Sequence, residues 1–405
     1  MMRQPISLAT RNLWKQKRRS FVTLLAIAIG FTAINLFAGY IANVYRGIQL
    51  NAIHHEGLGH LTIARAGFFE AGGMNPKKYL LDQPTLQKIL HASRTEPGVL
   101  LATPRLAVSG LASNGKVSTI FIGMGEVPAD RELIHHGPGQ TVTPQANTGT
   151  VAEGLATNLE IKAGDSLTLL AATVDGQTNA LDLTADRIVN TGIVETNDKL
   201  LQLSLDFTRQ LLDTDGADRV TLLLANTADT ARIQAALAAR FQAQGLSLEI
   251  KTWQDLSNSY KPVKAMFDTI FLFISLIVLV IVLMSIINTM SATVMERVRE
   301  IGTLRAIGMD RAGIRRLFSI EGSMLGILGC LVGAMVTTGL TLAINHAHLT
   351  YVPPGYVQPV PFTVMLLPNT QLAAGLVLAL IAMIAAFFPA MKAARLEIVD
   401  ALGHI

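Results

Sequence analysis

Few residue groups in this sequence have the types and spacing that chemistry requires. The segment Gly110-Leu-Ala-Ser-Asn-Gly-Lys116 has the glycine and lysine spacing of a phosphate-binding loop. Val117 follows the lysine, where such a loop needs a Ser or Thr hydroxyl for magnesium. Asn114-Gly115 lies between two strand-like runs and therefore predicts a hairpin turn. We expect no nucleotide to bind here.

Three histidines form a second group with metal-binding side chains. His54, His55 and His60 are close in sequence, but no cysteine is near them and no two are four residues apart. Zinc sites usually combine such ligands at regular spacings. We expect a solvated loop rather than a metal site. Because no nucleophile and base are paired in the sequence, we also predict no catalytic residue and no cofactor bound by this chain.

Two polar residues lie within long apolar runs. Asn35, near the middle of the first run, either hydrogen-bonds between helices or lines a substrate path, and we favour the first because it needs no ligand. Glu321 lies at the start of the third run. We expect it to anchor the helix or to pair with a nearby arginine, although acidic residues within membranes are also candidates for transport.

The elements that would position these residues are mostly membrane helices. The chain has 405 residues, of which 50% are hydrophobic and 15% are charged. Four apolar blocks reach the length of about 20 residues that crosses a bilayer. We therefore predict an α-helical membrane protein with four transmembrane helices and a large mixed α+β extracytoplasmic domain between helices 1 and 2. The predicted segments are a cytoplasmic interfacial helix (1–20), transmembrane helices (21–45, 269–295, 317–345 and 371–391), the outer domain (46–268), a cytoplasmic loop (296–316), a short outer loop (346–370) and a cytoplasmic tail (392–405).

The charges indicate an orientation for these helices. Residues 1–20 carry six basic residues and no acidic residue, and residues 296–316 carry six arginines against three acidic residues. Basic residues are enriched in cytoplasmic loops, so both segments and the C-terminus are predicted to be cytoplasmic. The net charge of +4 is concentrated beside the apolar blocks. It therefore predicts contact with membrane lipids and not with nucleic acid.

The outer domain reads as mixed α and β structure. Its predicted helices lie at 82–95, 153–160, 200–213 and 228–244, and its predicted strands at 99–111, 116–123, 166–172, 187–194, 219–224 and 246–250. Residues 136–150 and 173–186 have the composition of loops. Cys330 is the only cysteine, so no disulfide can form within the chain.

The third apolar run carries a glycine stripe, which consists of Gly322, Gly326, Gly329 and Gly333. Their spacing places all four on one face of a helix. Small residues allow helix backbones to approach closely, so we predict that this face packs against another helix.

Several motifs resemble a known family. They are VMERVREIGTLRAIGM at 294–309, EGSMLGILG at 321–329, PAMKAARLEIVDAL at 389–402 and, in the outer domain, VAEGLATNLEIKAGD at 151–165. The first three resemble the FtsX-like permease domain of ABC transporters of the MacB, LolC/LolE and FtsX superfamily. The fourth resembles the extracytoplasmic domain of that superfamily. The chain lacks the fused ATPase domain of MacB and has a larger outer domain than FtsX, so its layout is nearest to LolC and LolE.

The resemblance implies how such a chain would act. It implies a homodimer or a pair of related permeases in the bacterial inner membrane, with two separate ATPase subunits that bind ATP and magnesium. The segment 303–311 would be a coupling helix seated on the ATPase. The coupling residues would be Glu300, Arg305, Gly308, Met309 and Arg311, which lie in a loop without a nucleotide-binding motif. Gly302 and Gly308 would set turns, and Leu304, Ile307 and Met309 would offer apolar anchors.

Three functions stay open from the sequence. The layout favours release of lipoprotein or lipid from the inner membrane, with a lipoprotein or a periplasmic carrier as a further partner. The alternatives are tripartite efflux of drugs or peptides and transmembrane signalling to a periplasmic partner. No cluster of charges within the apolar runs marks an ion path, so a secondary transporter is not expected.

Overall fold

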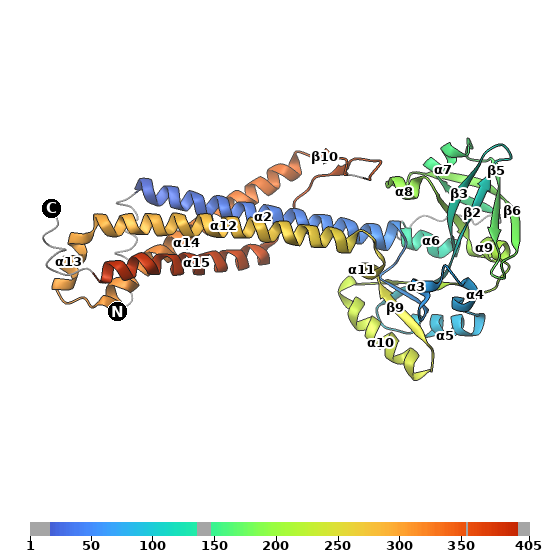
Figure 1. Ribbon diagram of the computed structural model, residues 1–405, viewed down its shortest axis with the longest axis horizontal. Coiled ribbons are helices and arrows are strands. Elements are labelled where there is room, and N and C mark those ends of the chain that lie inside the picture. Colours follow the sequence, from blue (N-terminus) through green and yellow to red (C-terminus); the bar gives the residue numbers. More distant parts are fainter. Residues whose placement is uncertain (1–16, 136–146, 354, 396–405) are drawn as a thin grey trace. The chain divides into compact units, whose positions relative to one another are not determined.

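The computed structural model describes residues 17–135, 147–353 and 355–395 (Figure 1). The chain divides into two compact units. The helical unit comprises the chain up to Tyr45, Val263–Thr350 and the chain from Pro361 onward, and the outer unit comprises Arg46–Pro262 and Tyr351–Val360. Most of the predicted interfacial helix (1–20) and of the predicted tail (392–405) lies outside the described residues.

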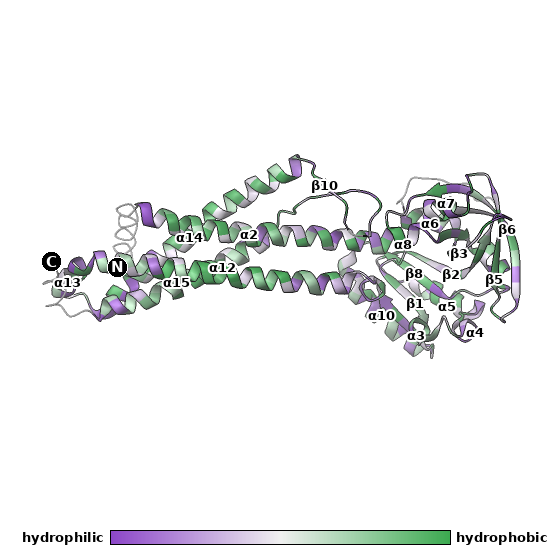
Figure 2. Cartoon of the chain, turned by 45° about the horizontal axis from the view of Figure 1, so that its top comes forward, coloured by the Kyte–Doolittle hydropathy of each residue, from purple (hydrophilic) through white to green (hydrophobic). Residues whose placement is uncertain are grey.

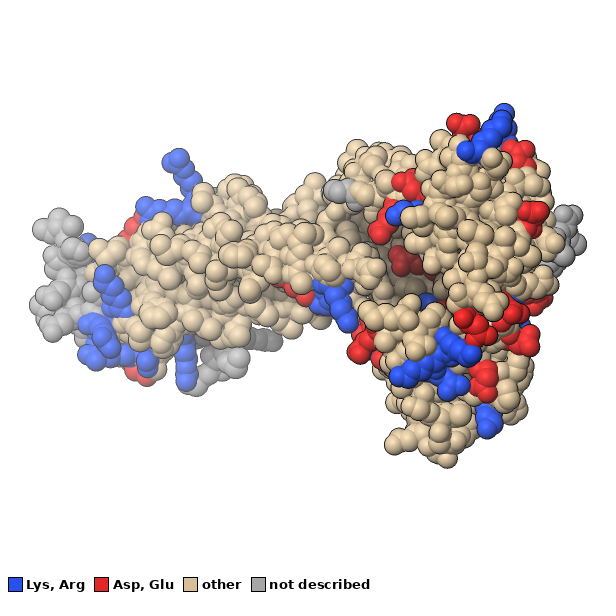
Figure 3. Space-filling model, turned by 45° about the vertical axis from the view of Figure 1, so that its right-hand side comes forward, with Lys and Arg blue, Asp and Glu red and all other residues tan. Residues whose placement is uncertain are grey.

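The helical unit is built from long apolar helices (Figure 2). They are α2 (Lys17–Leu50), α12 (Tyr260–Glu296), α14 (Arg311–His346) and α15 (Pro368–Ala394), with the short α13 (Val298–Ala306) between α12 and α14. In the described part of the chain, four helices are long and apolar enough to cross a membrane. Figure 3 shows their surface to be largely uncharged, with Lys and Arg gathered at one end.

α12 is longer than the span predicted at 269–295. Its 37 residues extend about 55 Å, whereas the hydrocarbon core of a bilayer is about 30 Å thick. Its only proline, Pro262, lies in its first turn, where no helical hydrogen bond is lost. A single helix therefore runs from the last residues of the outer unit to the start of α13.

The outer unit contains a closed ring of strands. The long β2 (Val99–Ser113) pairs with β3 (Ser118–Glu126) and β5 (Ser166–Ala172). The ring continues through β6 (Thr178–Val189), β4 (Thr148–Ala152) and β7 (Leu200–Ser204), and β7 returns to β3. Aliphatic side chains and Phe121 fill its interior, and α7 (Glu153–Asn158) and α9 (Leu205–Leu212) contribute to the same core.

β2 also belongs to a second lobe. There it pairs with β8 (Arg219–Leu224), which pairs with β1 (Leu61–Arg65), and β1 pairs with β9 (Leu248–Thr252). α5 (Gln83–Arg94) and α10 (Thr230–Ala243) pack on this sheet around a shared apolar core. The remaining described elements are η1 (Asn51–His55), α3 (Phe68–Ala71), α4 (Pro76–Tyr79), α6 (Pro128–His135), α8 (Val194–Asn197), η2 (Thr227–Asp229), α11 (Trp253–Leu256), β10 (Thr350–Tyr351) and β11 (Val360–Pro361).

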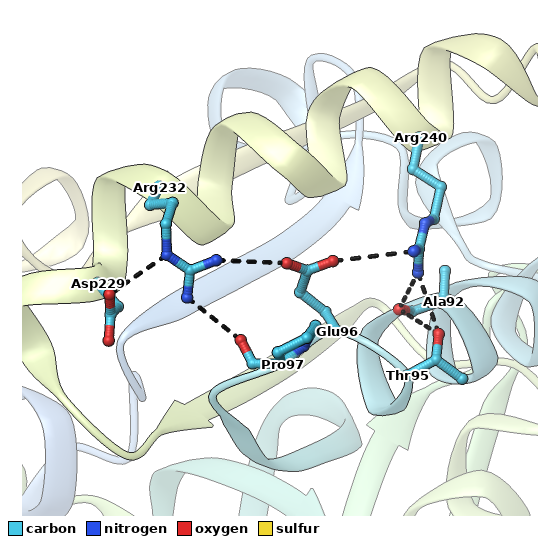
Figure 4. A network of polar contacts seen from close by, with 7 residues as sticks. All are labelled: Ala92, Thr95, Glu96, Pro97, Asp229, Arg232 and Arg240. Atoms are coloured by element: carbon cyan, nitrogen blue, oxygen red, sulfur yellow. Dashed lines mark hydrogen bonds and ion pairs between the residues drawn. The ribbon is translucent and has the colours of Figure 1, made fainter.

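A polar network joins α5 to α10 (Figure 4). Glu96, just beyond α5, lies 3.6 Å from Arg232 and 3.8 Å from Arg240, both on α10. Arg240 also donates to the carbonyl of Ala92 at 2.8 Å, and Arg232 donates to that of Pro97 at 3.3 Å. Glu96 is well buried, whereas the arginines are half exposed. The network fixes the position of α10 on the second lobe.

The segment Tyr351–Val360, which connects α14 and α15, is part of the outer unit. The N–H of Val194 donates to the carbonyl of Gly355 at 3.0 Å, and the N–H of Val357 donates to that of Gly192 at 2.9 Å. Ile193 and Tyr356 form an antiparallel bridge between these bonds. The segment therefore extends the outer unit as well as connecting two long helices.

The hairpin predicted at Asn114-Gly115 is confirmed, because β2 and β3 pair directly around it. The helix predicted at 200–213 is wrong in its first part, where β7 pairs with β3 and α9 follows. The loop predicted at 173–186 is also wrong, because β6 begins at Thr178 and ends at Val189, inside the strand predicted at 187–194. β6 alternates buried residues with polar exposed ones such as Asp182, and its polar face resembles a loop in composition.

Candidate functional site

The chain between α12 and α14 forms a capped helix followed by a tight turn. α13 ends in a Schellman motif, in which the N–H of Gly308 donates to the carbonyl of Arg305 and the N–H of Met309 donates to that of Leu304. Gly308 has a φ of 105°, a conformation that favours glycine. Asp310 then caps α14 by accepting a hydrogen bond from the N–H of Gly313 at 2.7 Å. We call the residues from Thr303 to Arg311 the tip.

The three predicted apolar anchors of the tip differ in their exposure to solvent. Leu304 and Met309 pack against a cluster formed by α12, α13, α14 and α15, which includes Ile301, Ile314 and Phe318. Ile307 is 80% exposed. The resemblance implied a coupling helix at residues 303–311. In the structure the helix is α13, which begins at Val298 and ends at Ala306. Gly302 is buried within α13 and sets no turn.

Charged residues hold α13 against the helices on either side. Arg297 lies between α12 and α13, 2.8 Å from Glu300 and 3.5 Å from Glu321. Its guanidinium lies 5.8 Å from the centre of the Phe318 ring. Glu321 is buried and pairs with Arg297, an arginine of the loop, which is a role that its position predicted. Arg297 was not among the site residues predicted from the sequence. Its position directly after the last residue of α12 was the only signal that could have found it.

The other predicted coupling residues lie on different parts of the tip and its helix. Glu300 is half exposed and is oriented by Arg297. Arg311 is exposed at the first residue of α14. Arg305 is partly buried in the last turn of α13. The exposed residues of the tip are Thr303, Ala306, Ile307, Gly308, Asp310 and Arg311.

The glycine stripe contacts two different helices. A Cβ at Gly322 would lie 2.2 Å from the Cβ of Ala386 on α15, and a Cβ at Gly326 would lie 2.6 Å from that of Ala382. At Gly329 and Gly333, the nearest atoms belong to Ile27 and Phe31 of α2. The single face predicted from sequence thus packs against α15 at its first half and against α2 at its second half.

Asn35 is buried, and its side chain donates to the carbonyl of Phe31 in its own helix at 2.8 Å. Its Oδ1 has no hydrogen-bond partner in the described structure. The side chain therefore does not form the hydrogen bond between helices that we favoured from sequence. An i−4 bond within one helix satisfies the amide donor locally.

A buried ion-pair cluster of the outer unit lies between β2, β3 and α6. Arg105 pairs with Glu126 and donates to the carbonyl of Gly57, and His135 Nε2 lies 3.4 Å from Glu126 Oε2. Burial raises the pKa of Glu126, but attraction to Arg105 and His135 outweighs this effect and lowers the pKa to about 2. The carboxylate therefore stays ionised and joins three elements in the core.

His60 is buried, so the expectation of a solvated loop is wrong for this residue. Its Nδ1 accepts from the N–H of Leu224 at 3.1 Å, and its Nε2 lies 3.0 Å from the hydroxyl of Thr227. Burial, with a smaller effect of His54, lowers the pKa of His60 to about 4. In the described residues, no three His, Cys, Asp or Glu side chains are grouped closely enough to hold a metal ion.

The helices that carry the tip match a known protein family. The family model for the FtsX-like permease C-terminal domain matches residues 272–398, which include α13, α14 and α15. Residues 272–398 are an FtsX-like permease domain. This chain is 23% identical over 437 aligned positions to the lipoprotein-releasing system transmembrane protein LolC of Xylella fastidiosa (strain Temecula1), and the alignment covers all of both chains.

Two further relatives match this chain over only part of their length. The macrolide export ATP-binding/permease protein MacB of Agrobacterium fabrum is 24% identical, in an alignment that covers all of this chain and 61% of that protein. The ABC transporter permease YtrF of Bacillus subtilis is 32% identical over 135 residues, which are 32% of this chain and 31% of that protein. The relatives similar to this chain thus include an ABC transporter permease, a MacB protein and a LolC protein.

Among solved structures, the periplasmic region of MacB from Actinobacillus actinomycetemcomitans is similar to part of this chain. That likeness has a TM-score of 0.35 and 12% identity, and covers 54% of this chain and 95% of that one.

Proposed function

We propose that this chain is the membrane subunit of an ABC transporter that works with a separate pair of ATPase subunits. ATP and magnesium bind to those subunits, and the permease itself performs no chemistry. In this proposal, ATP hydrolysis changes the position of α13, and the long helices transmit that change to an outer domain in the periplasm. Two permease chains, identical or related, form the membrane part in the bacterial inner membrane.

The exposed tip is the observation that carries this proposal. Its backbone shape is fixed by the Schellman motif and by the Asp310 cap, and its inner face is held by Leu304 and Met309. Ile307 remains exposed, and isolated apolar side chains on a rigid turn suit a partner's groove. Arg311 lies at the edge of the tip, where an exposed ion pair adds about 0.2–1 kcal/mol. Ile307 should therefore contribute more to docking than Arg311.

Two routes along the chain would carry motion from α13 to the outer domain. α12 is continuous from Tyr260 to Glu296, next to α13. The connection between α14 and α15 is hydrogen-bonded to residues 192–194 within the outer unit. A displacement of α13 therefore has a helical route through α12 and a second route through α14.

The proposed substrate is a lipoprotein or a lipid released from the inner membrane. Its support is the alignment with LolC, which covers the whole of both chains, whereas the MacB relative extends beyond the matched region. The test is to purify the complex from membranes, identify bound lipid or lipopeptide by mass spectrometry, and measure ATP-dependent release from spheroplasts. A bound drug-like compound with no release of lipoprotein would contradict this assignment and favour efflux.

Docking is tested with substitutions at the exposed anchor. We expect Ile307→Asp to leave membrane insertion and thermal stability unchanged but to abolish co-purification of the ATPase. Ile307→Leu should retain it. Ile120→Asp, at a residue of β3 that is also exposed, is the matched control and should co-purify normally. Normal ATPase association by Ile307→Asp would contradict the proposed docking site.

A further inference from the structure

A polar cavity opens between the ends of α2 and α12 where basic residues gather. Its volume is about 360 Å³, and its lining consists of Arg18, Arg19 and Val22 from α2 and Asn288, Thr289 and Ala292 from α12. All six residues belong to the helical unit. The cavity does not include the tip, and no part of the proposed coupling mechanism uses it.

The two arginines at the mouth of the cavity differ in their contacts. Arg19 forms an ion pair with Glu296, the last residue of α12. Arg18 is exposed and, within the described residues, forms no ion pair or hydrogen bond. One guanidinium therefore helps to hold the two helices together, and the other is exposed beside the cavity.

On the α12 side, the cavity is lined by two polar residues, Asn288 and Thr289. Asn288 is exposed and likewise lacks a hydrogen-bond partner among the described residues. It lies eight residues before Glu296, or about 12 Å along α12. An amide exposed to hydrocarbon without a partner is unfavourable, so a polar group is expected to meet it there. The neighbouring Thr289 is hydrogen-bonded to Thr23 of α2.

We propose that this cavity binds the headgroup of an anionic phospholipid. Arginine presents paired donors that match phosphate oxygens, so Arg18 would bind the phosphate. Asn288 would donate to the glycerol or ester oxygens, and Val22 and Ala292 would contact the first methylene groups of the acyl chains. Basic pockets between membrane helices are suited to such headgroups. The recognised chemistry is a phosphate anion attached to a lipid.

The test uses the full chain, stripped of lipid in detergent and titrated with phosphatidylglycerol or phosphatidylcholine by native mass spectrometry. We expect tighter binding of phosphatidylglycerol. Arg18→Gln should weaken that binding about fivefold, the effect of one basic residue near a membrane surface. Asn288→Leu removes a hydrogen-bond donor and should also weaken it. Arg316→Gln removes an exposed arginine of α14 outside the cavity and should have no effect. Arg18→Lys keeps the charge without the paired donors and should give an intermediate affinity.

Three results would overturn the proposal. Equal effects of Arg18→Gln and Arg316→Gln would show that only the overall charge matters. Displacement of phosphatidylglycerol by inorganic phosphate or glycerol 3-phosphate would show that the ligand is a free phosphate. A change of oligomeric state in Asn288→Leu with lipid affinity retained would assign Asn288 to a contact between copies. Thermal unfolding of every variant excludes misfolding as the cause of lost binding.

Discussion

The contact between α14 and α15 at Gly322 gives a quantitative prediction. A methyl group at Gly322 would lie 2.2 Å from the Cβ of Ala386, and the next nearest atoms, both on α15, are 3.5 and 3.7 Å away. Carbon atoms normally approach to about 3.5–4.0 Å. In Gly322→Ala, the two helices must therefore separate by about 1.5 Å. Because the obstructing atom is a single methyl group, Ala386→Gly should remove the clash.

The expected cost of Gly322→Ala is about 1–3 kcal/mol, the usual range for overpacking a closely packed interface. Alanine also stabilises a helix relative to glycine by about 1 kcal/mol, which offsets part of that cost. A Cβ added at Gly339, on the same helix, would have no atom within 4 Å. Gly339→Ala should therefore be neutral or slightly stabilising.

Thermal unfolding of the full chain in detergent measures these differences. Gly322→Ala should unfold at a lower temperature than the unsubstituted chain, and Gly322→Ala/Ala386→Gly should recover most of the loss. The reasoning would be refuted if Gly322→Ala behaved like Gly339→Ala, or if the double variant were no more stable than Gly322→Ala alone.

Further predictions concern the outer unit and its location. Glu126→Gln leaves the buried guanidinium of Arg105 without its anion and should destabilise the outer unit by about 3–5 kcal/mol. Hydrogen exchange in the intact chain measures this loss, and exchange as slow as in the unsubstituted chain would contradict it. The pKa of His60 in the folded chain is about 4, below its ordinary value of 6.5. The stability that neutral His60 contributes should therefore be complete above pH 6.5 and decline as the pH falls toward 4. A His60→Gln variant should lack that part of the pH dependence of unfolding. A cysteine introduced as Lys116→Cys, with Cys330→Ser, should react with an impermeant reagent before the inner membrane is broken; reaction only afterwards would reverse the proposed topology. Glu96→Ala should speed hydrogen exchange in α10, and unchanged exchange there would show that the network in Figure 4 contributes no local stability.

The sequence predicted an element correctly where the residues of one short segment were enough to determine its structure. The apolar runs predicted long helices because each is long enough to satisfy its backbone within one helix. Asn114-Gly115 predicted its hairpin because that dipeptide adopts the required backbone conformation. Gly308 likewise predicted a turn, because glycine readily adopts a positive φ. The Asp310 cap and the end of α13 at Ala306 were not predicted.

Tertiary structure decided which residues of the tip face outward. Leu304, Ile307 and Met309 are all apolar, so the sequence does not distinguish them. Leu304 and Met309 pack against the cluster around Phe318, whereas Ile307 is exposed. β7 likewise forms because β3 and β4 offer hydrogen-bonding edges to residues that could otherwise continue a helix. The burial of His60 depends on β8, whose Leu224 donates to it from 164 positions away.

The glycine stripe shows what the sequence by itself determined and what the fold decided. Sequence spacing determined that Gly322, Gly326, Gly329 and Gly333 share one helix face, because a helix repeats every 3.6 residues. Only the packed structure decided that α15 covers the first half of that face and α2 the second. Periodicity is a property of one segment, whereas the identity of a partner depends on how all the helices fill space together.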